Sequence, residues 1–154
     1  MALILIVDDD EKVRDTLYDL LSTDYRCRTA ETAEKALALL AAESYDVVLT
    51  DLSMSGISGV ELLSLILQKY PTTPVIVVSG ISDQEHAQGL IKMGAFDYVL
   101  KPFSLDVIEK SVRRALDYRR RLTDPSQSPA SGPGETAGTP NTMEILKEDW
   151  ERSN

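Results

Sequence analysis

The architecture of the chain can be predicted from residues 3–21, which read LILIVDDDEKVRDTLYDLL. A continuous apolar run comes first, three aspartates follow it, and apolar residues then recur at intervals of three and four. The continuous run is typical of a parallel strand that is covered on both faces. The later spacing predicts a helix over Glu11–Leu21 with one apolar side. The stretch therefore contains a strand, an acidic loop and a helix.

The same strand–helix unit recurs four more times before residue 122. We expect strands at Leu3–Val7, Tyr25–Ala30, Val47–Asp51, Val75–Ser79 and Phe96–Leu100. We expect helices at Glu11–Leu21, Thr32–Ala42, Val60–Leu67, Asp83–Met93 and Ser104–Leu122. The alternation predicts an α/β fold: a doubly wound, five-stranded parallel sheet with five helices, in the flavodoxin-like order 2-1-3-4-5. Helix 83–93 has the weakest pattern, since Gly89 interrupts a thin apolar face.

The composition changes at Thr123, after a predicted domain at residues 1–122. Residues 123–142, TDPSQSPASGPGETAGTPNT, contain almost no large apolar side chain, so we expect a flexible linker there. Residues 143–154, MEILKEDWERSN, regain helical character but are too short for a domain. We expect this short helical tail to begin a downstream output module that is missing from the chain. Trp150 in the tail then packs on the domain surface, on a partner or in that missing module.

Charge and composition limit the partners. The net charge of −9 argues against direct nucleic-acid binding, which normally shows a basic footprint. We interpret the one basic cluster, Arg113, Arg114 and Arg119–Arg121, as a solvated helix end, with a phosphate-binding patch as the alternative. No apolar run reaches the roughly 18 residues of a membrane span, and no secretory signal is visible. A single cysteine, Cys27, fits a reducing compartment. We therefore expect a cytoplasmic protein without membrane contact.

Polar residues gather at the carboxyl ends of the predicted strands. The first strand ends in Asp8–Asp10, the third in Asp51, the fourth in Ser79–Gly80 and the fifth in Lys101–Pro102. In the expected strand order these four strands are neighbours, so their ends meet at one edge of the sheet. Clustered carboxylates repel one another unless a cation lies among them, and oxygen ligands with few protein donors suit Mg²⁺.

The same residues can support phosphoryl transfer. Asp51, alone on the central strand, is the natural nucleophile, because a carboxylate can form an aspartyl phosphate. Lys101 adds a positive group beside the phosphoryl oxygens, and the Ser79 hydroxyl can donate to one of them. Gly80 leaves room for the phosphoryl group. Each feature alone is common at strand ends, so the combination carries the prediction.

The chain closely resembles response-regulator receiver domains of bacterial two-component signalling, the CheY-like superfamily. The resemblance covers residues 2 to about 120 and rests on the motifs ILIVDDDEKVR, DVVLTDLSMSGISG, VIVVSG and GAFDYVLKPF. It implies a Mg²⁺ site in which Asp9, Asp51 and the backbone carbonyl of Ser53 bind the ion and Asp8 acts through water. It also implies Asp51 as phosphoacceptor, Lys101 as phosphate-facing lysine, Ser79 and Tyr98 as switch residues, and a cis Lys101–Pro102 bond.

Two residues depart from the family pattern, and others are expected to be bystanders. Ser79 stands where threonine is more frequent, and Ser55 replaces the usual proline in the loop after Asp51. Asp10 is expected to cap the first helix. His86, the single histidine, is assigned no phosphodonor role.

The resemblance implies a phosphorylation switch in a response regulator or a hybrid signalling protein. A sensor histidine kinase or a histidine phosphotransfer protein would supply the phosphoryl group in a phosphorelay, and the domain would catalyse only its own phosphorylation and dephosphorylation. The switch would alter the face made by the fourth helix, fifth strand and fifth helix, through which a homodimer is plausible.

Two alternatives are weighed. A phosphorylation-independent, receiver-like binding module would be favoured by loss of a site residue, and none is lost. A flavin- or nucleotide-binding enzyme on the same fold would want a phosphate-binding loop after the first strand, where DDDEK would repel a phosphate in the absence of a metal.

Overall fold

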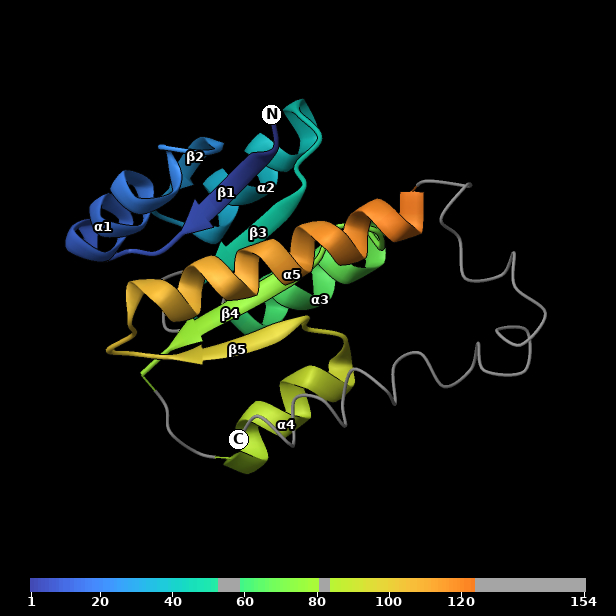
Figure 1. Ribbon diagram of the computed structural model, residues 1–154. Coiled ribbons are helices and arrows are strands. Elements are labelled where there is room, and N and C mark those ends of the chain that lie inside the picture. The colour runs from blue at the N-terminus through green and yellow to red at the C-terminus, as the bar shows by residue number, and fades with distance from the viewer. Residues whose placement is uncertain (53–58, 81–83, 124–154) are drawn as a thin grey trace.

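Five parallel strands form the centre of the fold. The computed structural model describes residues 1–52, 59–80 and 84–123. The strands are β1 (Leu3–Val7), β2 (Arg26–Ala30), β3 (Val47–Thr50), β4 (Val75–Ser79) and β5 (Asp97–Leu100). They pair side by side in the order β2-β1-β3-β4-β5, all parallel (Figure 1). The predicted sheet and its order are confirmed.

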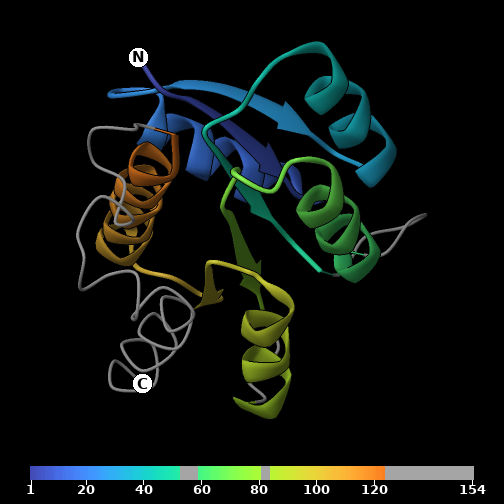
Figure 2. The same cartoon turned by 90° about the vertical axis from the view of Figure 1, so that its right-hand side faces the viewer.

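Helices cover both faces of this sheet. They are α1 (Glu11–Leu21), α2 (Ala33–Ala42), α3 (Gly59–Lys69), α4 (Gln84–Met93) and α5 (Leu105–Thr123). One buried cluster joins the sheet to α1 and α5, and a second joins it to α2, α3 and α4. Figure 2 shows these two layers on either side of the strands. Because β1, β3 and β4 are buried throughout, their continuous apolar runs meet helices on both faces.

The predicted boundaries hold to within two residues, the predicted Asp10 cap of α1 is present, and Thr32 caps α2. The backbone N–H of Lys12 donates to the Asp10 side chain at 2.9 Å, and that of Lys35 donates to Thr32 Oγ1 at 3.1 Å. The largest difference is α3, which is longer than predicted at both ends. The apolar periodicity that located it does not reach its first and last residues.

Helix α4 is regular despite its interrupting glycine. Gly89 lies on the exposed side, whereas the buried side is formed by Ala87, Leu90 and Ile91. The helix ends at Met93, and the φ of 126° at the following Gly94 is a left-handed conformation that glycine adopts without strain. The backbone N–H of Ala95 donates to the Leu90 carbonyl at 3.0 Å and closes that end.

Helix α5 is tied to the sheet by arginines of the basic cluster. Arg114 Nη2 lies 2.9 Å from Asp97 Oδ2, and the buried Ser111 hydroxyl donates to the same oxygen at 2.6 Å. Arg119 Nε pairs with Asp46 at 3.0 Å. The interpretation of the cluster as a merely solvated helix end is therefore incomplete, since two of its arginines bind acidic residues elsewhere in the fold.

Several predictions concern residues outside the described ranges. The linker, apart from Thr123, and the tail at residues 143–154 lie there, as do Ser53 and Ser55. Among the described residues, no helix has the length and apolar character to cross a membrane.

Cys27 is expected to be a slow nucleophile in the native protein. It is buried, and burial raises the pKa of its thiol to about 11, although Arg28 opposes the shift. At pH 8 a rise of about two units leaves about 100-fold less thiolate than in the unfolded chain. Alkylation by iodoacetamide in buffer and in urea checks this, and equal rates would contradict it.

The same pKa shift makes stability depend on pH. Because the thiol ionises at a lower pH in the unfolded chain than in the native protein, its contribution to the free energy of unfolding is lost as the pH rises from about 9 to about 11.

Candidate functional site

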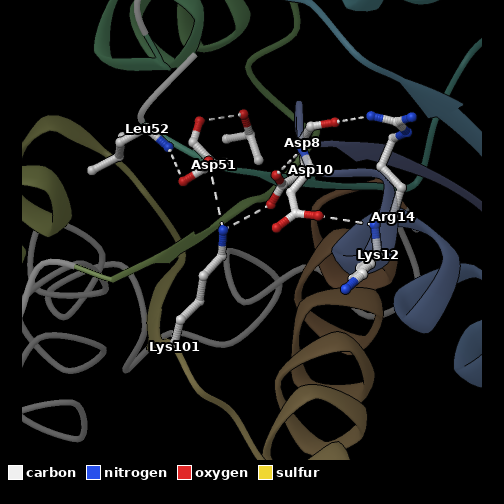
Figure 3. Close-up of polar contacts among 8 residues, drawn as sticks. Asp8, Asp10, Lys12, Arg14, Asp51, Leu52 and Lys101 are labelled. Atoms are coloured by element: carbon white, nitrogen blue, oxygen red, sulfur yellow. Dashed lines mark hydrogen bonds and ion pairs between the residues drawn. The ribbon is translucent and has the colours of Figure 1, made fainter.

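Side chains from the carboxyl ends of β1, β3 and β5 meet at one edge of the sheet. Asp8 follows β1, Asp51 follows β3 and Lys101 follows β5. The Lys101 ammonium lies 2.9 Å from Asp8 Oδ2 and 3.5 Å from Asp51 Oδ2. Figure 3 shows it extending between the two carboxylates. The structure thus brings together three of the residues for which the strand order predicted convergence.

Three carboxylates form a group that can hold a metal ion. Asp8, Asp9 and Asp51 each offer an oxygen, and these oxygens lie within 4.8 Å of one another. Asp8 and Asp51 are only 1% and 5% exposed, whereas Asp9 is exposed. A set of oxygen donors that is partly buried and open to water on one side fits a hard divalent cation such as Mg²⁺.

Lys101 supplies the positive charge that these buried carboxylates need. Burial by itself would lower the pKa of its ammonium, but the hydrogen bond and charge of Asp8, followed by those of Asp51, outweigh burial and raise it. Lys101 is therefore charged at neutral pH. Buried carboxylates without such a partner would carry an uncompensated charge, which is strongly destabilising.

The backbone around Asp51 fixes its carboxylate. The Leu52 N–H donates to Asp51 Oδ1 at 2.8 Å, which leaves Oδ2 on the side of Lys101 (Figure 3). The Asp51 N–H donates to the Val7 carbonyl at 2.9 Å and holds the end of β3 against β1. The Thr50 hydroxyl donates to the Asp51 carbonyl at 3.1 Å. These bonds orient one oxygen of Asp51 toward Lys101.

Sequence reasoning assigned no role to Arg14, which supports the loop after β1. Its Nη1 donates to the Asp8 carbonyl at 2.8 Å, while the Asp10 N–H donates to Asp8 Oδ1 at 2.9 Å (Figure 3). Both bonds hold Asp8 in place. An arginine in the first turns of a helix is usually solvated, so only the tertiary contact reveals this role.

Gly59 was also missed, and its lack of a side chain allows α3 to approach Asp51 closely. A Cβ at this position would lie 2.4 Å from the Asp51 carbonyl oxygen and 2.4 Å from Leu52 Cα. The Gly59 N–H donates to the Leu52 carbonyl at 3.1 Å. The N-terminus of α3 is therefore packed directly on the backbone that carries Asp51, at a spacing that only glycine permits.

The predicted switch residues lie on the two neighbouring strands. Ser79, the last residue of β4, is 1% exposed, and a Cβ on the following Gly80 would meet no protein atom within 4 Å. Tyr98 of β5 is half-buried and packs edge-on against His86 of α4, with ring centroids 6.2 Å apart. The Lys101–Pro102 peptide bond is cis, as expected. The expected metal ligand Ser53 lies outside the described residues.

Comparisons with known proteins agree with this geometry. The sequence profile of the response regulator receiver domain matches residues 4–113. The DNA-binding transcriptional regulator NtrC of Salmonella typhimurium is 36% identical over 133 residues, which make up 86% of this chain and 28% of that protein. The solved structure of NtrX from Brucella abortus, at 34% identity, has a TM-score of 0.76 over 82% of this chain and 29% of NtrX.

A shorter solved protein matches along its whole length. A response regulator receiver domain protein from Clostridium thermocellum, at 28% identity, has a TM-score of 0.75 over 80% of this chain and 100% of its own. By contrast, this chain spans less than a third of the length of the curated relatives that it matches.

Proposed function

Because the chain belongs to the family of response regulator receiver domains, the signalling switches of two-component systems, we propose that Asp51 is its phosphoacceptor. One observation carries the proposal. The Asp51 carboxylate belongs to the acidic group formed with Asp8 and Asp9, and its Oδ2 lies 3.5 Å from the Lys101 ammonium. A nucleophile, a cation site and a fixed positive charge are the groups that phosphoryl transfer to a carboxylate requires.

Asp9, Asp51 and the Ser53 carbonyl would bind Mg²⁺ directly, with Asp8 acting through water. Of these ligands, the structure describes Asp8, Asp9 and Asp51, and all three offer carboxylate oxygens, which are the ligands that Mg²⁺ prefers. Bound there, Mg²⁺ would neutralise negative charge on the phosphoryl oxygens.

The chain's own residues perform the transfer. Asp51 Oδ2 attacks the phosphorus of a phosphohistidine, a new P–O bond forms, the P–N bond breaks, and the imidazole nitrogen that leaves takes up a proton. The Leu52 N–H keeps the other carboxylate oxygen in place during the attack. Lys101 and the Ser79 hydroxyl then donate to phosphoryl oxygens. The donor would be a sensor histidine kinase or a histidine phosphotransfer protein, and water would later hydrolyse the acyl phosphate.

The phosphoryl group would shift a two-state equilibrium. Its contact with Ser79 would draw that hydroxyl inward, and Tyr98 would follow, which alters the surface made by α4, β5 and α5. The output would come from a module downstream of residues 123–142, with residues 143–154 at its start. A homodimer through the same surface would be one form of output. No described residue favours the phosphorylation-independent alternative, because Asp8, Asp9, Asp51 and Lys101 are all in place.

Intact-mass spectrometry after incubation with Mg²⁺ and acetyl phosphate tests the proposal. We expect one phosphoryl adduct in the parent chain, none in Asp51→Asn and none with EDTA. Asp15→Asn, an exposed carboxylate on α1, is the matched control and should be modified like the parent. Since some receivers ignore small donors, beryllofluoride binding provides a second readout. Absence of both the adduct and a Mg²⁺-dependent beryllofluoride response would refute the phosphorylation switch and favour the binding module.

Mg²⁺ should stabilise the native protein, because its ligands come together only in the folded state. At a concentration 100 times the dissociation constant, the free energy of unfolding should rise by about 2.7 kcal/mol. Urea unfolding at constant ionic strength measures this. Asp9→Asn should lose most of the effect, since Asp9 is an exposed member of the acidic group. An equal Mg²⁺ effect in Asp9→Asn would show that the ion binds elsewhere.

A further inference from the structure

An apolar patch lies around β5, to which α4, β5 and α5 each contribute an exposed side chain. Met93 at the end of α4, Leu100 at the end of β5 and Val107 in the first turn of α5 are 43%, 44% and 47% exposed. β5 lies between α4 and α5 in both views of the fold (Figures 1 and 2). We call these three residues the β5 patch.

Contacts of α5 place Val107 on the side that faces β5. Ser111 and Arg114, four and seven residues further along, share one side of the helix with it. Both donate to Asp97 at the start of β5, at 2.6 and 2.9 Å. Val107 therefore lies toward β5 rather than toward the opposite side of the helix.

Contacts of α4 place Met93 in the same way. Met93 shares one side of α4 with His86, seven residues earlier, and the ring of His86 meets Tyr98 of β5 edge-on. Tyr98 and Leu100 are two residues apart in one strand, so their side chains leave it on the same face. The three patch residues are thus grouped around β5, not scattered over the surface.

The last segment of the chain carries a matching surface. At helical spacing Met143, Leu146 and Trp150 fall on one side, which is the anchor pattern of a helix that binds an apolar groove. Twelve residues are too few for a stable isolated helix. The net charges of the two segments are opposite in sign. Residues 143–154 have four acidic and two basic residues, net −2, and α5 has three acidic and six basic residues, net +3.

The connecting segment has the length that this contact needs. Val107 lies 16 residues before the end of α5 at Thr123, a distance of about 24 Å along the helix. Residues 124–142 number 19 and include four prolines among glycine, serine and other small residues, and a flexible chain of that length has a root-mean-square span of about 22–26 Å. The effective concentration of a tethered segment at its binding site is greatest when the span of the linker matches the distance to be bridged. It reaches the millimolar range for short flexible linkers. At micromolar protein concentration the patch therefore meets its own tail before that of a second copy.

We propose that residues 143–154 bind as an amphipathic helix to the β5 patch of their own domain. The contact does not depend on phosphoryl transfer at Asp51, because it follows from exposed area, charge and linker length. If the proposed function holds, the bound tail covers the surface that the switch alters, and so competes with other partners of that surface.

Trp150, the single tryptophan, reports on this contact directly. Its emission maximum and its quenching by acrylamide are measured in the 154-residue chain and in a free peptide of residues 143–154. We expect blue-shifted emission and quenching several-fold weaker in the chain than in the peptide. Val107→Glu and Leu146→Glu should each restore peptide-like quenching. Tyr18→Glu, at an exposed apolar position on α1, should not.

The variants are chosen so that misfolding does not imitate the result. An acidic residue in the first turn of α5 favours the helix dipole, so Val107→Glu should keep the domain folded, and Leu146→Glu lies outside the domain. The proposal would be overturned if acrylamide quenched Trp150 in the parent chain as strongly as in the free peptide. It would also be overturned if Val107→Glu left the weak quenching of Trp150 unchanged. Protection that disappears on dilution would also overturn it, because the tail would then bind a second copy.

Discussion

Gly59→Ala is expected to lower the free energy of unfolding by about 3 kcal/mol and to slow phosphorylation of Asp51 by on the order of 100-fold. The added Cβ would lie 2.4 Å from the Asp51 carbonyl oxygen and 2.9 Å from the Leu52 carbonyl carbon, both of them backbone atoms. No side-chain rotation relieves such contacts, so the start of α3 must move away from β3. The movement breaks the hydrogen bond from Gly59 N–H to Leu52 and displaces the backbone that orients Asp51.

Urea unfolding and the rate of adduct formation measure the two effects of Gly59→Ala. Gly89→Ala is the matched control, since an added Cβ there meets no atom within 4 Å and the position is on the exposed side of a helix. It should stabilise the protein by about 0.5–1 kcal/mol, because glycine costs a helix more backbone entropy than alanine. Similar free energies of unfolding for Gly59→Ala and Gly89→Ala would show that the start of α3 has more room than the structure indicates.

Lys101→Met is expected to reduce the rate of phosphoryl transfer by on the order of 100- to 1000-fold, the usual effect of removing one donor to a developing charge. The variant keeps most of the side-chain volume and removes the ammonium beside Asp8 and Asp51. Mg²⁺ affinity should change in the opposite direction. Loss of a competing positive charge next to the carboxylates should tighten metal binding on the order of tenfold.

Opposite changes in rate and affinity separate an electrostatic role for Lys101 from a structural one. An unfolded or loosened variant would lose both phosphorylation and metal binding. Rates come from intact mass against time, and affinities from a Mg²⁺ titration of stability. Lys110→Met, which removes an exposed lysine paired with Asp106 on α5, should change neither quantity. Unchanged phosphorylation in Lys101→Met would remove this lysine from the proposed chemistry.

Patterns within single elements predicted most of the fold. The bounds of β1, α1 and β4 agree residue for residue with those predicted from apolar runs, helical spacing and an acidic cap. Such signals depend on neighbours within about one helical turn, so they can be read from the chain alone. Errors of one or two residues occur where elements end on polar or glycine residues, as at the start of α3.

The approximate position of the site was predictable for a topological reason. Parallel strands joined by right-handed crossovers bring their carboxyl ends to one edge of the sheet. Asp8, Asp51 and Lys101, 93 residues apart at the extremes, therefore had to converge once the strand order was known. For a sheet of this order, the amino-acid sequence by itself thus determined the edge that carries the chemistry and the types of group that meet there.

Only the tertiary structure decided the contacts that depend on how closely two elements pack. Lys101 lies nearer to Asp8 than to Asp51, Arg14 reaches back to the Asp8 carbonyl, and Gly59 leaves no room for a side chain beside Asp51. Each of these contacts is set by differences of about an ångström in the separation of a helix from a strand. Local periodicity carries no information on that separation, because it results from the simultaneous packing of side chains from many parts of the chain.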